Sequence, residues 1–401
     1  MPVLKNIGLL ATCDHSQSEI PHAAVAWEEA RITWVGPEAA LPPQLKTTKS
    51  FDAKAALVIP GLIDCHTHLA FGGWRADEFE ERMKGASYLD IAKRGGGILS
   101  TVAKTRALTE DELFERCRQF LDGMLRLGVT TLECKSGYGL DLETELKILK
   151  AYRRLSHATR LDIIPTLLAA HTVPAEYRGS KHDYIRLICD SILPLAASEK
   201  LARFCDIFVE HSAFTADDAR QILRLGQTLG LKSKLHVDQL SDGSGAALAA
   251  ELGAVSADHL EHISDTGIAA LKRSGTTAVL LPLATVFTKE KPLNARRLID
   301  AGVRVAVATD FNPGTAPSYH LPLAMLLSCT LCGLTPREAL RAATINAASA
   351  LEEEDRLGSI EIGKQADFAV LDSSDPAQWL YHFRPNDCRM TFKKGELLWQ
   401  A

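Results

Sequence analysis

Two histidines that stand one residue apart, His66 and His68, end an apolar run within the segment PGLIDCHTHLAFGG, residues 60–73. Residues i and i+2 of a β-strand point to the same face of a sheet, so we expect both imidazoles to project together. The run gives way at that point to a turn that contains two glycines. Paired imidazoles at the end of a strand indicate half of a metal site, and the other ligands must come from distant parts of the chain.

Further polar residues fall at the ends of the other apolar runs. Taken singly, each has an ordinary explanation: a lone histidine is more often a hydrogen-bonded core residue than a ligand. Asp310, before FNPG, is typical of a residue that opens a turn, and Lys135 can extend to solvent. The polar residues in question are Glu133, Lys135, Tyr138, His171, His236, Asp238, Gln239, His259, His262, Asp310 and Asn312.

The joint pattern of these residues indicates a metal centre. His66 and His68 end the first apolar run, His236 ends the fifth and Asp310 ends the eighth. Imidazole nitrogens and carboxylate oxygens are donors that suit zinc or another divalent transition metal. Such an ion, with one position left open, makes water available as a nucleophile near neutral pH. The donor set therefore predicts metal-assisted hydrolysis of a carbonyl-type or amidine-type carbon.

Eight apolar runs alternate with amphipathic segments, and the runs are almost continuously hydrophobic, as strands buried on both faces are. Between the first two runs, Thr109 and Glu112 predict the capping box of a helix that ends before Gly128. The alternation predicts an α/β fold, a (β/α)8 barrel over residues 58–357, with its chemistry at the carboxyl ends of the strands. The runs are ALVIPGLIDCHTH, GVTTLECKSG, LDIIPTLLAAH, FCDIFVEHSAF, LKSKLHVD, AVSADHLEHI, TTAVLLPLAT and VRVAVATDFNPG.

The two ends of the chain differ from this pattern. Residues 1–57 hold short strand-like segments with turn signals and no strong helical periodicity, and residues 358–401 do the same. Short strands punctuated by turns are typical of β-sheet domains. We therefore expect a small composite β-sandwich, built from both termini, beside the barrel.

Composition limits the partners and the compartment. The formal net charge of −5 and the pI near 6.2 do not suit nucleic acid or an anionic membrane as a partner. No segment approaches the ~18 consecutive apolar residues of a membrane span. The N-terminal MPVLKNIGLLATCDHS lacks the long apolar stretch and the small-residue cleavage site of a secretory signal. We expect a strand there, and a cytoplasmic protein with a small-molecule substrate.

Nine cysteines, an odd number scattered through a long chain, predict reduced thiols rather than a disulfide framework. Cys329 and Cys332 form a C-x-x-C pair within AMLLSCTLCGL. No second pair exists to complete a zinc site. We therefore interpret these two cysteines as small apolar residues on one face of a buried helix.

The motifs resemble those of the amidohydrolase superfamily: the His-x-His after PGLID, the later histidine, the aspartate that closes the eighth run, and the tail GSIEIGKQADFAVLD. Within it, the segments CHTHLAFGGWRADEFEERMKGASYLDIAKRGGGILSTV, KSGYGL, AAHTVPAEY, HVDQLSD, VSADHLEH and ATDFNPGTAPS are similar to the imidazolonepropionase family. This resemblance spans essentially the whole chain and is clearest over residues 55–370. It implies hydrolysis of 4-imidazolone-5-propanoate to N-formimidoyl-L-glutamate, with one zinc or iron ion, by a homodimer.

The resemblance also implies roles for individual residues. His66, His68, His236 and Asp310 match the metal ligands, and His259 matches a histidine of the proton relay. The residues that match substrate contacts are Arg75, Tyr88, Tyr138, His171, Asn312, Gly314 and Thr315.

Arg75, in the segment GGWR, is the residue that matches the anchor of the propanoate. A guanidinium is a planar fork that holds a carboxylate through two parallel hydrogen bonds. The alternative is a surface arginine that follows a loop. We favour the anchor because the flanking loop is rich in glycine and lies just beyond His68.

Gln239 departs from the pattern of many relatives. It stands three residues after His236, where deaminases of the superfamily and some imidazolonepropionases carry glutamate. A neutral amide cannot act as a base. We therefore assign proton transfer to Asp310, relayed by His259, and give Gln239 hydrogen bonds to the substrate ring. The absence of the acid argues against a deaminase.

Two other functions stay open at the level of sequence. One is a different cyclic-amide hydrolase or deaminase of the superfamily, which acts on another small ring that bears a carboxylate. The other is a barrel without catalysis that serves as an assembly or binding protein. The presence of all four metal donors disfavours the second.

Overall fold

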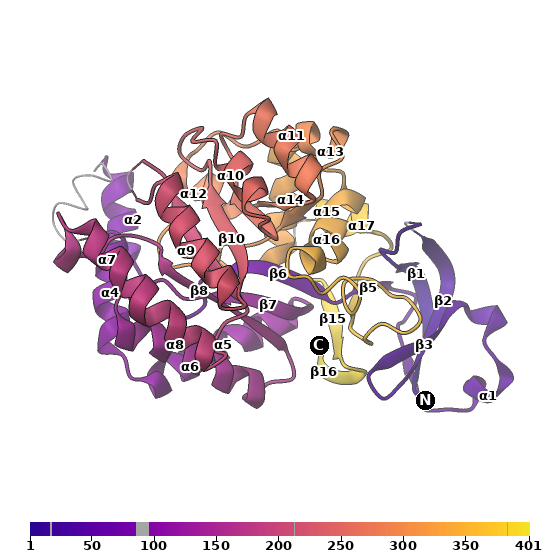
Figure 1. Cartoon of the computed structure of the whole chain (residues 1–401). Helices are drawn as coiled ribbons and strands as arrows, with labels where there is room; N and C mark the ends of the chain where they lie inside the picture. Colours follow the sequence, from indigo (N-terminus) through magenta and orange to yellow (C-terminus); the bar gives the residue numbers. More distant parts are fainter. Residues whose placement is uncertain (17, 86–95, 212, 383) are drawn as a thin grey trace.

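The computed structural model of the chain describes residues 1–16, 18–85, 96–211, 213–382 and 384–401 (Figure 1). Two eight-stranded sheets organise this part of the chain: one forms a parallel barrel, and the other combines strands from both termini. None of the helices in the described ranges has the length and hydrophobicity that a membrane span requires.

The barrel strands follow one another in chain order, and each pairs in parallel with the next. Every predicted apolar run contains one of them, so the predicted α/β barrel is confirmed. Most residues of these strands are buried, which explains why the runs are so hydrophobic. The strands are β6 (Leu62–Thr67), β7 (Val129–Lys135), β8 (Asp162–Ala170), β9 (Phe204–Val209), β10 (Lys232–Val237), β11 (Ser256–His259), β12 (Thr277–Leu280) and β13 (Val305–Val307).

The last strand returns to the first and closes the barrel. Just beyond β13, the backbone N–H of Asp310 donates to the carbonyl of His66 over 3.0 Å. The N–H of His68 donates in the opposite sense to the carbonyl of Phe311 over 2.9 Å. The seam of the barrel therefore passes through three of the four predicted metal ligands.

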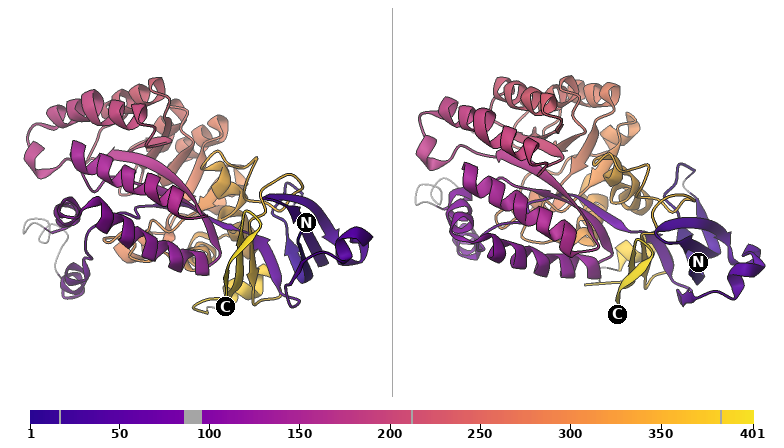
Figure 2. Two further views of the ribbon diagram at one scale, coloured as in Figure 1. Left: turned by 90° about the horizontal axis from the view of Figure 1, so that it is seen from below. Right: turned by 60° about the horizontal axis from the view of Figure 1, so that its bottom comes forward.

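Helices cover the outside of the barrel (Figure 2). α5 begins as predicted: the Thr109 hydroxyl accepts the Glu112 N–H over 3.2 Å, and the Glu112 carboxylate accepts the Thr109 N–H over 2.8 Å. The helices are α2 (Ala76–Met83), α4 (Ile98–Ala107), α5 (Glu110–Arg126), α6 (Leu142–Ala158), α7 (Lys181–Leu187), α8 (Leu193–Ser198), α9 (Ala216–Thr228), α10 (Gly245–Glu251), α11 (Asp265–Ser274), α12 (Pro282–Thr288), α13 (Arg296–Asp300), α14 (Leu321–Cys332), α15 (Pro336–Ala342) and α16 (Ile345–Ser349).

The cysteines of α14 agree with their interpretation as packing residues. Cys332 is buried in the main core, and Cys329 is partly buried against it. All nine cysteines of the chain are unbridged. The C-x-x-C pair is therefore part of a helix that packs on the barrel.

The second sheet joins the two ends of the chain, which lie side by side in both views of Figure 2. Its strand order is β16-β15-β14-β5-β1-β2-β3, and β4 pairs with the N-terminal residues of β1, Val3 to Lys5. Trp27, Phe368 and Phe392, from opposite ends of the sequence, pack together in its core. The elements are β1 (Val3–Ala11), β2 (Glu19–Glu28), β3 (Arg31–Pro37), α1 (Pro43–Lys46), β4 (Ser50–Asp52), β5 (Leu57–Pro60), β14 (Phe368–Leu371), α17 (Pro376–Tyr381), β15 (Cys388–Lys393) and β16 (Glu396–Gln400).

The start of the barrel differs from the first apolar run. That run reads as one strand, but the chain turns at Gly61 and forms two strands in different sheets. β5 pairs with β1 and β14 of the terminal sheet, whereas β6 opens the barrel at Leu62. Two consecutive buried strands in different sheets have no polar interruption between them, so hydrophobicity alone gives no signal of the break.

A cluster of ion pairs holds the terminal sheet against the barrel. Asp162, at the start of β8, contacts Lys393 at 2.8 Å, Arg356 at 2.9 Å and Lys394 at 2.9 Å. Lys393 is fully buried and also contacts Asp367 at 2.8 Å. Burial alone would raise the pKa of Asp162, but the charges of Lys393 and Arg356 outweigh it and hold the pKa well below its usual range. The carboxylate is therefore charged in the folded protein and bridges the barrel and the terminal sheet.

We expect the substitution Asp162→Asn to lower the free energy of unfolding by about 3 kcal/mol at pH 7, because it leaves the buried Lys393 ammonium with a single anionic partner. The pKa of Asp162 is lower in the folded protein than its value of about 4 in the unfolded chain. Its charge therefore stabilises the folded state above about pH 4, and this stabilisation is lost as the pH falls through the folded pKa. The difference in the free energy of unfolding between Asp162→Asn and wild type should therefore become smaller below about pH 4. Denaturant unfolding at several pH values measures it. Asp183→Asn, at an exposed pair with Arg186, is the control; equal effects of the two substitutions would contradict the role of Asp162.

Candidate active site

The four predicted metal donors lie together at the carboxyl end of the barrel. Asp310 Oδ1 is 3.4 Å from His66 Nε2 and 3.3 Å from His68 Nε2. The ring of His236, from β10, lies 4.5 Å from that of His66 between centroids. All four residues are buried. The barrel therefore brings together residues that are up to 244 positions apart in the sequence.

Two carboxylates beneath these histidines fix their orientation. Asp258 lies 2.7 Å from His66 Nδ1, and Asp206 lies 3.1 Å from His236 Nδ1. Each carboxylate accepts a hydrogen bond from the Nδ1–H of its histidine, so Nε2 of the neutral ring keeps its lone pair. Both Nε2 atoms are buried and have no hydrogen-bond partner among the described residues. Buried lone pairs that converge without a protein partner fit a divalent cation.

The pKa values of the donors agree with this fit. Burial lowers the pKa of His68 and that of His236, so both rings are neutral near pH 7, as metal ligands must be. Burial alone would raise the pKa of Asp310, but its contacts with His66 and His68 outweigh burial and hold that pKa well below its usual range. His66 differs from the other donors: burial alone would lower its pKa, but its contacts with Asp258 and Asp310 outweigh burial and raise it, so a cation must displace a proton from this ring.

A buried charge network lies under the donors. Lys135 Nζ contacts Glu133 at 2.8 Å and Asp206 at 2.7 Å, and Lys234 Nζ contacts the other oxygen of Glu133 at 2.7 Å. Lys135 does not extend to solvent, because the side chain is fully buried between carboxylates. Two ammonium groups thus neutralise part of a cluster of four carboxylates, and the excess negative charge favours a bound cation. The four carboxylates are Glu133, Asp206, Asp258 and Asp310.

Sequence reasoning did not single out Asp206 and Asp258. Each stands inside an apolar strand, Asp206 in FCDIFV and Asp258 in SADH, and each is the partner of a histidine on another strand. A single carboxylate within a continuously buried strand is the signal that marks such a residue, because an isolated buried charge is unstable without a partner.

His171 and Tyr138 lie beside the donors, as predicted for substrate contacts. The His171 ring stacks on that of His68 with centroids 5.1 Å apart, and Tyr138 lies 5.4 Å from His171. His171 Nδ1 is 3.0 Å from the carbonyl of Gly137, which fixes it as the donor. Burial, together with the neighbouring His68, lowers the pKa of His171 to about 3. A neutral imidazole with its Nε2 lone pair available therefore lies beside the cluster.

The turn after β13 carries Asn312, Gly314 and Thr315. Asn312 Oδ1 accepts the N–H groups of Gly314 and Thr315, each over 2.8 Å, and Asn312 Nδ2 donates to the carbonyl of Asp310 over 2.7 Å. A Cβ atom added to Gly314 would lie 1.5 Å from Arg75 Nη2. The guanidinium of Arg75 therefore packs directly against this turn, on the same rim of the barrel as the donors.

The remaining predicted residues are His259, Gln239 and Tyr88. His259 ends β11 with its ring 5.4 Å from that of His236, and its φ of +80° is a strained value of a kind often found at active sites. Gln239 is half-buried, and within the described ranges its side chain makes no hydrogen bond. Tyr88 lies outside the described residues. The roles assigned to these three residues, like those assigned to the other site residues, stay predictions.

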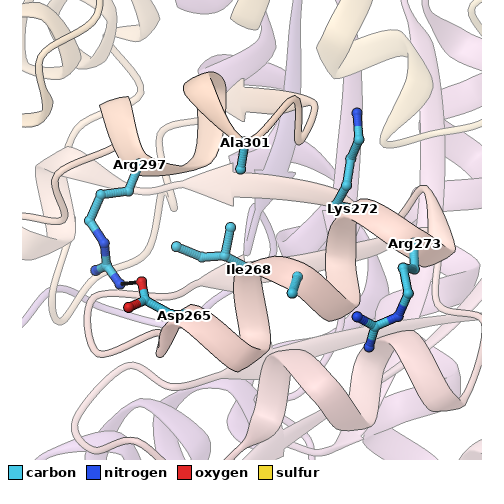
Figure 3. Close-up of a pocket in the computed structure, with 7 residues that line it drawn as sticks. Asp265, Ile268, Lys272, Arg273, Arg297 and Ala301 are labelled. Carbon is cyan, nitrogen blue, oxygen red and sulfur yellow. Dashed lines mark hydrogen bonds and ion pairs between the residues drawn. The ribbon is translucent and has the colours of Figure 1, made fainter.

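A hollow on the outside of the barrel does not belong to this site. It has a volume of about 610 Å³ and lies between α11 and α13 (Figure 3). Its wall contains an ion pair between Arg297 and Asp265 at 2.6 Å, and Lys272 and Arg273 also line it. None of the metal donors lines it. The cluster at the carboxyl end of the strands is the candidate active site.

Comparison of the sequence with known proteins agrees with the geometry. The model of the Amidohydrolase family matches residues 195–398. An imidazolonepropionase from Shewanella putrefaciens is 45% identical over 399 residues, which cover 98% of this chain and 97% of that protein. An imidazolonepropionase from Myxococcus xanthus is 48% identical over 380 residues, which cover 94% of this chain and 90% of that protein.

Solved structures with the same fold are more distant in sequence. An adenosine deaminase from Xanthomonas campestris with bound zinc superposes with a TM-score of 0.75 at 18% identity, over 99% of this chain and 92% of that chain. An atrazine chlorohydrolase from Arthrobacter aurescens complexed with zinc gives a TM-score of 0.77 at 16% identity, over 100% of this chain and 95% of that chain. These structures share the architecture of barrel and terminal sheet.

We expect Asp206→Asn to weaken binding of a divalent ion by about 10–100-fold, because the amide no longer fixes the His236 tautomer. His236→Ala should weaken it further, because it removes a donor. Titration of metal-free protein with zinc measures the affinity. His262→Ala is the control, because His262 lies 3.9 Å from Glu290 and outside the donor cluster. Unchanged affinity in Asp206→Asn would show that the carboxylate does not orient a ligand.

Proposed function

The chain belongs to the imidazolonepropionases, within the amidohydrolase family, and we propose that it hydrolyses 4-imidazolone-5-propanoate to N-formimidoyl-L-glutamate in histidine degradation. The reaction adds one water molecule across the ring C–N bond next to the carbonyl. The observation that carries the proposal is the position of Arg75 against Gly314, on the rim that bears the metal donors. An enzyme for this substrate must hold a carboxylate and a cyclic amide at the same time.

The described residues offer a complementary surface to each part of the substrate. The guanidinium of Arg75 provides paired N–H donors for the propanoate. His171 and Tyr138, beside the donor cluster, lie where a small planar ring would contact them. The buried surroundings exclude water from these contacts and strengthen them.

The resident metal in this proposal is one zinc or iron ion held by His66, His68, His236 and Asp310. Once bound, the ion supplies Lewis acidity for the ring carbonyl and for the attacking water. The second oxygen of the Asp310 carboxylate accepts the proton that the water loses. The proton then passes to the leaving ring nitrogen, from Asp310 or through His259. Gln239 cannot take part as a base and instead donates a hydrogen bond to the ring.

We also propose that the protein works in the cytoplasm as a homodimer and has no nucleic-acid or membrane partner. The net charge of −5 and the nine unbridged cysteines support a reducing compartment and argue against a polyanionic partner. Size-exclusion chromatography with light scattering measures the oligomeric state directly.

We expect purified protein to consume 4-imidazolone-5-propanoate, to lose this activity when the metal is removed, and to regain it when zinc or iron is added back. The decrease in substrate absorbance measures the rate. The same ring without its propanoate tail should be a much poorer substrate, because it offers Arg75 no carboxylate. Metal-loaded protein that leaves the substrate intact but hydrolyses or deaminates another ring would favour a different member of the superfamily. Metal-loaded protein that is inactive on all such rings would favour a binding role.

We expect Asp310→Asn to lower kcat by about 10²–10⁴-fold per bound metal ion, because an amide cannot accept the proton of water. The rate must be divided by the metal content, since Asp310 is also a predicted ligand. Asp265→Asn, at an exposed ion pair on α11, is the control and should keep full activity. A full rate per bound ion in Asp310→Asn would assign the proton to another group.

A further inference from the structure

Glu78 links two parts of the site that are far apart in the sequence. One carboxylate oxygen, Oε2, lies 3.6 Å from Nε of Arg75, one turn earlier at the start of α2. The other, Oε1, accepts the backbone N–H of Gly97 over 2.8 Å. The side chains of Arg75 and Glu78 are only 12% and 15% exposed, so water competes weakly for these contacts. A single side chain thus touches both the predicted carboxylate anchor and the start of α4.

The contact with Arg75 orients the guanidinium without covering its terminal edge. Glu78 faces the Nε side of the fork, and Gly314 packs against Nη2 and Cζ. A bidentate carboxylate is held by two N–H groups of the fork. With Nε directed to Glu78 and one face against Gly314, the pair of terminal nitrogens is the edge left for a ligand. No hydrogen bond fixes Nε among the described residues, so the ion pair with Glu78 is the contact that holds it.

The contact with Gly97 sets the wall of a neighbouring cavity. Gly97 precedes α4 with φ +74° and ψ −150°, a conformation that is essentially restricted to glycine. Residues 96 and 98–99 line a cavity of about 410 Å³, and Thr172 and Val173 line it on another side. These last two residues directly follow His171. The hydrogen bond from Gly97 therefore ties the position of this wall to the helix that begins after Arg75.

We propose that Glu78 is a positioning residue for the carboxylate end of the substrate: it orients Arg75 and fixes the start of α4 around the bound propanoate. The inference rests on the proposed function, since it assumes that Arg75 binds the substrate carboxylate. Among the described residues, the carboxylate of Glu78 contacts Arg75 and Gly97, neither of which is a predicted metal donor or proton carrier. Its loss therefore raises KM for a substrate with a carboxylate tail and leaves kcat and metal content largely unchanged.

Two substitutions separate the two contacts. Glu78→Gln keeps an acceptor for Gly97 but removes the charge beside Arg75, whereas Glu78→Ala removes both. We expect KM for 4-imidazolone-5-propanoate to rise about tenfold in Glu78→Ala and several-fold in Glu78→Gln, with kcat within twofold of wild type. Glu80→Ala, on the exposed face of the same helix, is the matched control and should leave KM unchanged. The ring without its propanoate tail should react at equal rates in all four proteins.

A double-mutant cycle shows whether Glu78 acts through Arg75. In an Arg75→Ala background, Glu78→Gln should have no further effect on KM, because the group that it orients is gone. Equal effects of Glu78→Gln in both backgrounds, or an unchanged KM in the wild-type background, would overturn the proposal. The metal content and the thermal midpoint of each variant show whether it folds. If Glu78→Ala does not fold, the KM of Glu78→Gln alone decides between the outcomes. Lack of turnover by metal-loaded wild type would instead reject the proposed function, and this inference with it.

Discussion

The closure of the barrel depends on a backbone exchange at the seam, where His66 and His68 meet the chain that follows β13. The N–H of Asp310 donates to His66, and the N–H of His68 donates back to the residue after Asp310. The Asp64 carboxylate strengthens the seam by accepting the N–H and the hydroxyl of Thr309, over 3.0 and 2.6 Å. The same hydrogen bonds that close the sheet therefore set the distance between three metal donors. Any change that opens the seam separates the donors, so fold and metal site form one structural unit.

The charge network beneath the seam explains how the barrel interior accommodates so many buried ionisable groups. Buried charges are destabilising unless each has a partner, and lysines inside a core are rare for that reason. Lys135 and Lys234 neutralise part of the acidic cluster and hold Glu133 and Asp206 in fixed places. Of the four carboxylates, Asp310 lies on the Nε2 side of His66 and His68. A cation at that point completes the balance, so metal binding and the stability of the interior support each other.

Much of this arrangement was predictable from sequence, and the rest was not, for physical reasons. Periodicity located the eight barrel strands and the capped helix after Thr109, because burial on both faces and capping are local properties. The proximity of the four predicted donors could be foreseen, because strand ends in a barrel share one rim. The break at Gly61 and the histidine partners Asp206 and Asp258 could not, because pairing between distant strands leaves no local pattern. Glu78 was hidden for the same reason, since its contact with Gly97 spans 19 residues.

The two ends of the site are built in different ways, and this difference bears on specificity. The metal donors stand on strands and seam residues that are locked by sheet hydrogen bonds and buried charges, so they tolerate little change. Arg75 stands instead between a turn and a short helix, held by one ion pair and by the absence of a side chain at Gly314. If Arg75 binds the substrate tail as proposed, changes there alter which tail a substrate can carry without disturbing the predicted donors. The barrel and terminal sheet are shared with solved structures at 16–18% identity, so the fold tolerates extensive sequence change, and specificity depends on the residues at its rim.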